Sequence, residues 1–330
     1  MDICVNENPR FTKWVVARGY LREPFVLLDV GVQGGEHRRW RHLGAHLVVH
    51  GFDAIREAAD KLARKGLPNR HYHWLAVGDE DREGELYFNP GDPRSSSLYR
   101  PGAERIGQYA AEPLRVRVRR LDTLRAEGVI PAADFLKVDV EGGEKDVLLG
   151  ARGLLAGGIL AVESETNFNA SPTYPRTHFC TLQEILLEHR MLVFDVNFDR
   201  IPREAFQRAL AASGRRPVGD HWSVGKPSTL NVLFCRDPSS ERDDVFGEAR
   251  ADLSPDQLVK LAIIFELHGL NDIAVDLVER CRGELGARFD ADEAIGLLAN
   301  PRCRRSQGWR SWRVTGPLRT AARKLRELRR

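Results

Sequence analysis

Carboxylates gather in the segment LKVDVEGGEKDVLLGA, residues 136–151, where an apolar strand leads through a glycine pair into a helix. Asp139 and Glu141 stand at the end of the strand, and Glu144 opens the helix. A carboxylate near a hydroxyl group can remove the proton of that hydroxyl. The alternative for an acid in the first turn of a helix is a purely structural role as a cap. For Glu144, capping explains the acid as well as a catalytic role does. A single cap does not explain the two further acids, Asp139 and Glu141. We therefore predict Asp139 and Glu141 as catalytic residues.

A glycine-bearing turn, DVGVQGG, is the second place where the sequence indicates a ligand. Its glycines let the backbone approach a ligand in front of a helix N-terminus, although a purely structural turn is the alternative. Asp53 follows Gly34 by nineteen residues, near the ~20-residue spacing at which an acid binds a ribose diol. Together these features indicate a ribonucleoside cofactor. The residues of the turn predicted to bind it are Asp29, Gly31, Gln33, Gly34 and Gly35.

The charge of this turn indicates which of two kinds of cofactor, one with a pyrophosphate or one with a positive charge, it would bind. A dinucleotide places its pyrophosphate at the helix N-terminus, normally behind a GxGxxG loop. Here the pattern is DxGxxGG, so Asp29 puts negative charge where a phosphate-binding loop avoids it. An acid suits a cationic ligand with an amino group, and S-adenosylmethionine has both a sulfonium and an amino-acid end. We expect S-adenosylmethionine, with an NAD-dependent oxidoreductase as the alternative.

Short strands that alternate with helices position these residues, which predicts parallel βαβ units. Apolar runs predict strands at residues 25–31, 46–53, 71–79, 134–140 and 159–165, and helices over 55–65 and 143–158. Residues 115–124 alternate with period two and predict a half-exposed strand. Runs at 191–199 and 229–237, joined by a long connection, predict an antiparallel hairpin closing the sheet's edge. Ligands bind beyond the carboxyl ends of such strands, where the acids are Asp29, Asp53, Asp79, Asp139 with Glu141, and Glu163 with Glu165.

The composition is that of a globular protein, with 42% apolar and 29% charged residues among 330. No apolar run approaches the roughly 18 residues of a membrane span, and the N-terminus lacks a signal pattern, so we expect a cytoplasmic protein. The five cysteines lie far apart without metal-ligand spacing and are predicted to be reduced. We predict a catalytic domain over residues 1–240, a helical appendage over 241–301 that opens on Ser254 as N-cap, and a basic tail over 302–330.

The motifs together resemble the FkbM-type family of S-adenosylmethionine-dependent O-methyltransferases. The resemblance covers about residues 25–237 and rests on DVGVQGG, GFD, LAVGD with EGELYF and SSSL, RRLDTL, and above all FLKVDVEGGEKDVLLGA with AVESE. It implies a doubly wound, mostly parallel α/β sheet of the class I methyltransferase, Rossmann-like type. It also implies that Asp139 lies beside the methionine end of the cofactor, and that Asp79 and Ser97 belong to the cofactor site.

Methyl transfer to a hydroxyl requires a base as well as alignment of donor and acceptor. Besides the two acids, His178 in PRTHF and His221 in GDHW are candidate bases, because both lie in predicted loops near the sheet's carboxyl edge. A surface or structural role is the alternative for each histidine. Some O-methyltransferases use a divalent metal held by acids at such strand ends, so Mg²⁺ stays open, and we assign no metal ligand.

The tail differs in charge from the rest of the chain. Residues 302–330 carry a net charge of +10, which leaves −7 for residues 1–301, whereas a nucleic-acid enzyme would place positive charge around its active site. Within 309–330, leucines and alanines at helical spacing predict a helix on an anionic membrane surface, or alternatively one docked on the acidic body. WRVTGPLR also resembles tails of bacterial enzymes that build surface polysaccharides. We expect a glycan or small-molecule acceptor and no nucleic acid; a non-catalytic membrane-associated scaffold is a further alternative.

Overall fold

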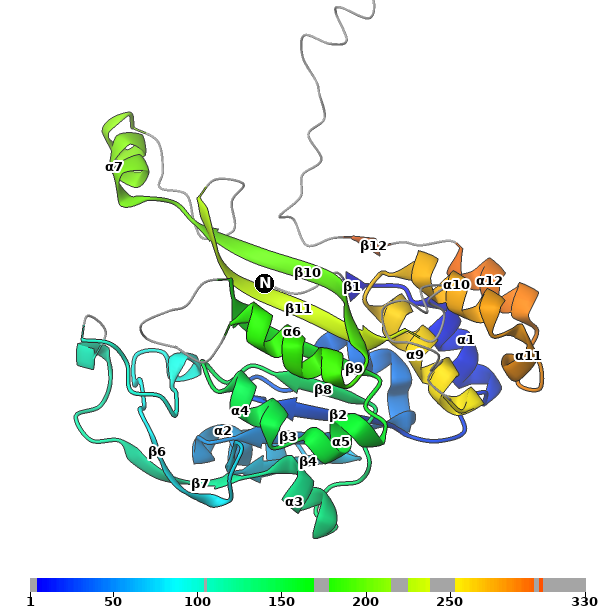
Figure 1. Ribbon diagram of the computed structural model, residues 1–330, viewed down its shortest axis with the longest axis horizontal. Helices are drawn as coiled ribbons and strands as arrows, with labels where there is room; N and C mark the ends of the chain where they lie inside the picture. The colour runs from blue at the N-terminus through cyan, green and yellow to red at the C-terminus, as the bar shows by residue number, and fades with distance from the viewer. Residues whose placement is uncertain are drawn as a thin grey trace, which may run out of the picture.

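A mostly parallel sheet forms the centre of the protein, as Figure 1 shows for the computed structural model. The structure describes residues 5–103, 106–168, 178–214, 225–237, 253–299 and 303–304. Over these residues the sheet has seven strands in the order β10-β11-β9-β8-β2-β3-β4. Their bounds are β2 Phe25–Val30, β3 Leu47–Asp53, β4 Arg70–Trp74, β8 Phe135–Val138, β9 Ala161–Asn167, β10 Met191–Ile201 and β11 Lys226–Arg236. Only β11 is antiparallel to both of its neighbours.

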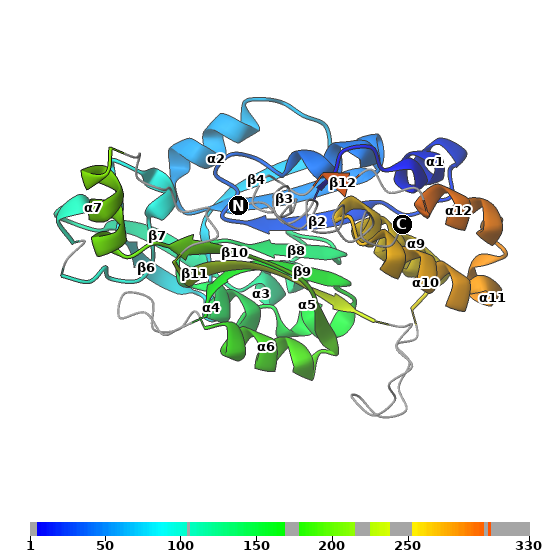
Figure 2. The ribbon, with the colours of Figure 1, turned by 90° about the horizontal axis from the view of Figure 1, so that it is seen from above.

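Helices cover both faces of the sheet, as the view from above shows (Figure 2). One layer contains α1 (Arg10–Arg18), the 3₁₀ segment η1 (Arg38–His46) and α2 (Arg56–Ala63). The other contains α3 (Leu121–Ala126), α4 (Glu144–Leu149), α5 (Arg152–Gly157) and α6 (Phe179–Glu188). Along β2, Phe25 and Leu27 join one hydrophobic cluster while Val26 and Leu28 join another. This alternation between two cores is what a strand buried on both faces requires, and it confirms the doubly wound fold.

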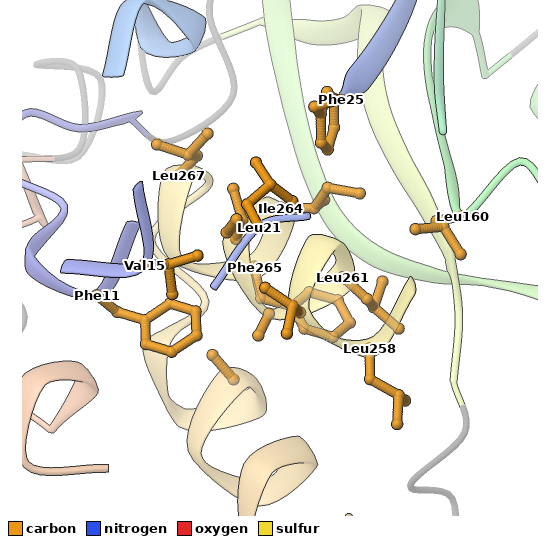
Figure 3. Packing of buried hydrophobic residues seen from close by; sticks show 14 of the residues in the cluster. Phe11, Val15, Leu21, Phe25, Leu160, Leu258, Leu261, Ile264, Phe265 and Leu267 are labelled. Atoms are coloured by element: carbon orange, nitrogen blue, oxygen red, sulfur yellow. The ribbon is translucent and has the colours of Figure 1, made fainter. Parts of the chain in front are cut away.

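Four helices follow at the C-terminal side: α9 (Pro255–Leu267), α10 (Asn271–Arg280), α11 (Arg282–Leu285) and α12 (Ala291–Leu298). As predicted, α9 begins at Ser254, whose side chain accepts from Gln257 N in a capping box. Figure 3 shows Leu258, Leu261 and Phe265 of α9 in the same core as residues of the sheet and of α1. None of the described helices is both long and apolar enough to cross a bilayer.

Three buried ionisable side chains tie α9 to distant parts of the chain. Lys260 Nζ lies 3.0 Å from Asp134 Oδ1 at the start of β8. Glu266 accepts hydrogen bonds from Phe11 N (2.9 Å) and Thr12 N (2.7 Å) at the start of α1. His268, just after α9, lies 3.4 Å from Glu163 of β9. Because buried polar groups need hydrogen-bonding or charged partners, these contacts fix how α9 lies on the sheet.

Some predicted elements differ from the observed ones. The strand predicted at 71–79 is broken after Trp74, and its second part, β5 (Ala76–Val77), joins β7 (Leu114–Arg119) and β6 (Arg82–Leu86) in a small separate sheet. The strand predicted at 115–124 ends with β7 and gives way to α3. The helix predicted over 143–158 divides into α4 and α5 at Gly150, where a Cβ would overlap the carbonyl of Gly78.

The predicted antiparallel hairpin is confirmed by the pairing of β10 with β11. Its later strand, β11, lies inside the sheet, so β10 forms the edge. The predicted connection between them contains α7 (Glu204–Ala212), which stands at the tip of the projecting ribbon (Figure 1). The predicted boundary near residue 240 and the predicted tail helix over 309–330 fall outside the described residues and stay predictions. Two residues of the tail segment are described, as β12 (Cys303–Arg304), which pairs with β1 (Val5–Asn6).

Candidate active site

A cavity of about 480 Å³ opens at the carboxyl edge of the sheet. It lies over the ends of β2, β3, β8 and β9 and is closed on one side by residues 92–98. Most of the predicted site residues line it: Asp29, Gly31, Gln33, Gly34, Gly35, Asp53, Ser97, Asp139 and Glu141. The structure therefore brings together acids that stand more than one hundred residues apart in the sequence, as expected for the ends of neighbouring parallel strands.

Three predicted residues are not placed in this cavity. Asp79 lines a smaller neighbouring hollow, because β5 turns away from the central sheet before it. His178 is the residue directly before α6, where its side chain makes no capping hydrogen bond, and it is not among the residues that line the cavity. His221 lies outside the described residues, so its place stays untested.

The turn after β2 is shaped by close backbone approach. Gly31 has φ +88°, and a Cβ there would overlap the carbonyl oxygen of Asp139. The amides of Gly31 and Val32 both donate to the carbonyl of Phe52, at 2.9 and 3.1 Å, which ties the turn to the end of β3. Gly31 therefore has a structural role beside its place in the cavity, and only glycine tolerates this conformation without strain.

Asp53 fits the role predicted from its spacing. Its side chain is buried at the end of β3, where Oδ1 accepts from Ile55 N at 2.8 Å. Burial raises the pKa of Asp53 to about 6, against the smaller opposite effect of this hydrogen bond. A carboxylate held this way in a cavity wall suits a ribose diol, which donates two hydrogen bonds.

A lysine that the sequence analysis missed lies between two acids of the floor. Lys137 Nζ is 3.5 Å from Asp29 Oδ1 and 3.3 Å from Asp139 Oδ2. Burial raises the pKa of Asp29, and Lys137 acts in the opposite direction. Asp29 Oδ1 is nevertheless buried with no hydrogen-bond partner among the described residues. Apart from the long contact with Lys137, this buried oxygen is unsatisfied, and an amino group suits it better than a phosphate does.

Three further acids, Glu144, Glu163 and Glu165, have different partners. Glu144 Oε1 accepts from the amides of Val140 (3.2 Å) and Gly142 (3.1 Å), so it stabilises the turn after β8 and acts as the cap that the alternative reading proposed. Glu163 pairs with the buried Arg39 at 3.0 Å, away from the cavity. Glu165, two positions further along β9, lines the cavity.

Glu165 has the most unusual environment of these acids. Burial, followed by the charges of Asp139 and Glu141, raises the pKa of Glu165 to about 8. An acid with so high a pKa is a stronger base than an ordinary carboxylate once it has lost its proton. The strand-end rule points to Glu165, but the sequence does not distinguish it from Glu163.

Ser97 helps to close the cavity. Its hydroxyl donates to the carbonyl of Glu141 at 2.7 Å and accepts from Tyr99 N at 3.0 Å. Nearby, the hydroxyl of Tyr99 donates to Asp146 of α4. These bonds hold residues 92–98 against the turn after β8, so both sides of the cavity are fixed.

No group of three or more His, Cys, Asp or Glu side chains could hold a metal ion within the part of the chain that the structure describes. The ammonium of Lys137 lies where the acids of the floor come closest together.

Comparisons with known proteins agree with this geometry. Residues 29–189 match the family model of the methyltransferase FkbM domain. The 2-O-methyltransferase NoeI of Sinorhizobium fredii (strain NBRC 101917 / NGR234) is 28% identical over 140 residues, which are 38% of this chain and 57% of that protein. The chain thus matches less than two thirds of this relative's length.

Solved structures overlap the chain in part. The methyltransferase FkbM from Methylobacillus flagellatus KT is 16% identical with a TM-score of 0.38, covering 69% of this chain and 48% of its own. N-methyltransferase NodS from Bradyrhizobium japonicum WM9 is 10% identical with a TM-score of 0.32, covering 70% of this chain and 98% of its own.

Proposed function

Since residues 29–189 form a methyltransferase domain of the FkbM family, we propose that the protein transfers a methyl group from S-adenosylmethionine to a hydroxyl of a saccharide. The observation that carries the proposal is the cavity itself, whose floor presents Asp29 and Asp139 on either side of Lys137 while Asp53 stands in its wall.

The residues present fit the methyl donor. Asp53 lines the cavity as an acceptor for the ribose, and Asp29 and Asp139 line it as partners for the ammonium of the amino-acid end. Gly31, Gly34 and Gly35 leave room beside the backbone. When bound, the sulfonium supplies a carbon already activated for displacement. The chain's contribution is then to align the acceptor with it and to take the hydroxyl proton.

Three acids at the cavity are candidates to take that proton: Asp139, Glu141 and Glu165. The high pKa of Glu165 makes it a stronger base than an ordinary carboxylate once it is ionised. A cationic donor in the cavity favours the ionised form of every acid near it, so the same ligand that supplies the methyl group prepares the base.

The acidic floor also weighs against the alternatives. A nicotinamide dinucleotide would bring a pyrophosphate towards Asp29 and Asp139, whose two carboxyl groups outnumber the single ammonium of Lys137. A scaffold without activity would not need a buried acceptor directed at a cavity. The saccharide assignment is supported by the similarity to a 2-O-methyltransferase and by the polysaccharide-enzyme resemblance of the tail. We further propose that residues 309–330 hold the protein at an anionic membrane surface.

Calorimetric titration tests the cofactor assignment. We expect S-adenosylmethionine and its demethylated product to bind in the micromolar range, and NADH not to bind. Asp53→Ala should lose at least tenfold in affinity, because about 1.5–3 kcal/mol is typical of hydrogen bonds to a charged group. Asp60→Ala on the exposed face of α2 is the matched control and should bind normally. Normal binding by Asp53→Ala, or tight binding of NADH, would contradict the proposal.

A further inference from the structure

A row of polar side chains crosses the sheet from the cavity to its edge. Glu165 of β9 lies directly opposite Asn231 of β11, and Asn231 lies directly opposite Asn197 of β10. Two residues further along β9, Asn167 lies opposite Thr229 of β11. Directly opposed residues of antiparallel strands project to the same face, with Cβ atoms roughly 4.5–5.5 Å apart. We call Asn167, Asn197, Thr229 and Asn231 the amide row; Glu165 joins it to the cavity.

The amide row lies on the face that α9 covers in part. Leu233 and Cys235 of β11 belong to the core shared with α9, whereas Val232 and Phe234 belong to the core of the other face. Because successive side chains of a strand point to opposite faces, Asn231 lies on the same face as Leu233 and Cys235, the face that α9 covers. Towards the far end of the strands from the cavity, Phe194 packs on Phe265 of α9 with ring centroids 5.1 Å apart. The side chains of this face are therefore apolar under the helix and polar beyond it.

The chemistry of the amide row is neutral. Each of its four residues is partly exposed. Asparagine is depleted in strands because it gains little from packing on a pleated surface. On the opposite face of the same hairpin the exposed side chain next to Asn197 is apolar, Val196, with 37% of its surface exposed. An amide offers a donor and an acceptor side by side, as neighbouring hydroxyls of one sugar ring require.

We propose that the amide row binds the acceptor saccharide and presents one of its hydroxyls to the cavity at Glu165. This inference rests on the proposed methyltransferase function. Neutral amides and a hydroxyl group match an uncharged polyol, whereas an anionic acceptor would need a cation. Because Asn231 lies directly opposite Glu165, which lines the cavity, a sugar bound to the row would have a hydroxyl next to the acids of the cavity.

Methyl transfer to simple sugars tests the assignment. The probes are methyl glycosides of glucose, galactose, rhamnose and fucose at millimolar concentration, with radiolabelled S-adenosylmethionine. In the full-length chain we expect at least one to be methylated. Asn231→Ala and Asn197→Ala should each raise KM for that sugar about tenfold, equivalent to the roughly 1.4 kcal/mol of one hydrogen bond. Affinity for S-adenosylmethionine, measured separately by calorimetry, should change less than twofold.

Val196→Ala, on the same strand but the opposite face, is the matched control and should leave KM unchanged. An unchanged KM in both asparagine variants would overturn the role of the row. Binding of S-adenosylmethionine without methylation of any of the sugars would overturn the saccharide assignment while leaving the cofactor assignment intact. Absence of S-adenosylmethionine binding would instead refute the proposed function itself.

Discussion

Acids of the same type have different roles around this cavity, and their neighbours decide which. Glu144 is satisfied by backbone amides, and Glu163 by Arg39. Burial alone would raise the pKa of Glu163, but the charge of Arg39 lowers this pKa below its ordinary value. Glu165 has acids as neighbours instead, so its pKa is raised. Position along the strand therefore separates an acid held in an ion pair from an acid with a raised pKa in the cavity only two residues away.

The pKa of Asp53 predicts how cofactor binding depends on pH. The pKa of Asp53 is raised to about 6 in the free protein. If the ionised form accepts from the ribose, about 90% of the protein is competent at pH 7 and about 10% at pH 5. Affinity should therefore fall several-fold as pH falls from 7 to 5. A carboxyl with an ordinary pKa near 3.8 would lose affinity only below about pH 4.5.

Calorimetric titrations between pH 5 and 8 measure this dependence, and Asp53→Asn is the control. The amide cannot ionise, so the variant should bind more weakly at pH 7 and should lose the part of the pH dependence that comes from this residue. A wild-type affinity that is flat down to pH 5 would show that ionised Asp53 does not contact the cofactor.

The sequence predicted most acids of the site because strand ends and a spacing rule locate them without any tertiary information. Asp29, Asp53 and Asp139 were found in this way. Lys137 was missed because an inward-facing lysine in an apolar strand is recognisable only when the register sets Asp29 directly opposite. Asp79 was included because the strand before it was predicted to remain in the central sheet, and nothing in its composition marks the break.

Among the elements, the turn after β2 is the one on which the cavity most depends. Gly31 has a positive φ, and a Cβ there would meet the backbone of Asp139, which cannot move without disturbing β8. Gly31→Ala should therefore cost about 3 kcal/mol of stability, because backbone strain adds to the overlap. The same substitution should weaken cofactor binding, since it separates two walls of the cavity.

Gly34→Ala in the same turn provides the control, because a Cβ at Gly34 would meet no atom within 4 Å. Urea unfolding should place this variant within about 0.5 kcal/mol of the unchanged protein. Equal stabilities for the two variants would mean that the turn adapts and that Gly31 is not required by close approach.

Element prediction succeeded where burial on both faces leaves a clear apolar run, as in β2 and β3. It failed where tertiary contacts divide a continuous pattern. The break between α4 and α5 depends on Gly150 lying against Gly78, and on Asp122, whose carboxylate accepts from the amides of Gly153 and Leu154 at the start of α5. These partners are distant in sequence, so no local pattern reports them.

At the scale of the whole molecule, the C-terminal helices and the sheet share one hydrophobic core. Leu261 and Phe265 of α9 belong to the same cluster as Phe11, Phe25 and Phe135. Residues 241–301 were predicted to form a helical appendage to the catalytic domain. The shared core predicts that the described parts of the two segments unfold together, because neither can lose its partner without exposing apolar surface.

Glu266 tests this coupling, because it is the buried acid through which α9 holds the start of α1. Besides the amides of Phe11 and Thr12, it accepts from the Thr12 hydroxyl at 2.7 Å. Glu266→Ala would leave buried donors unpaired and should cost about 3 kcal/mol. Glu279→Ala, which removes only an exposed ion pair with Arg282, should cost less than about 1 kcal/mol. Calorimetry should show one transition in all three proteins, shifted down as a whole in Glu266→Ala. A second transition, with the sheet melting at its original temperature, would show that the helices fold as a separate unit.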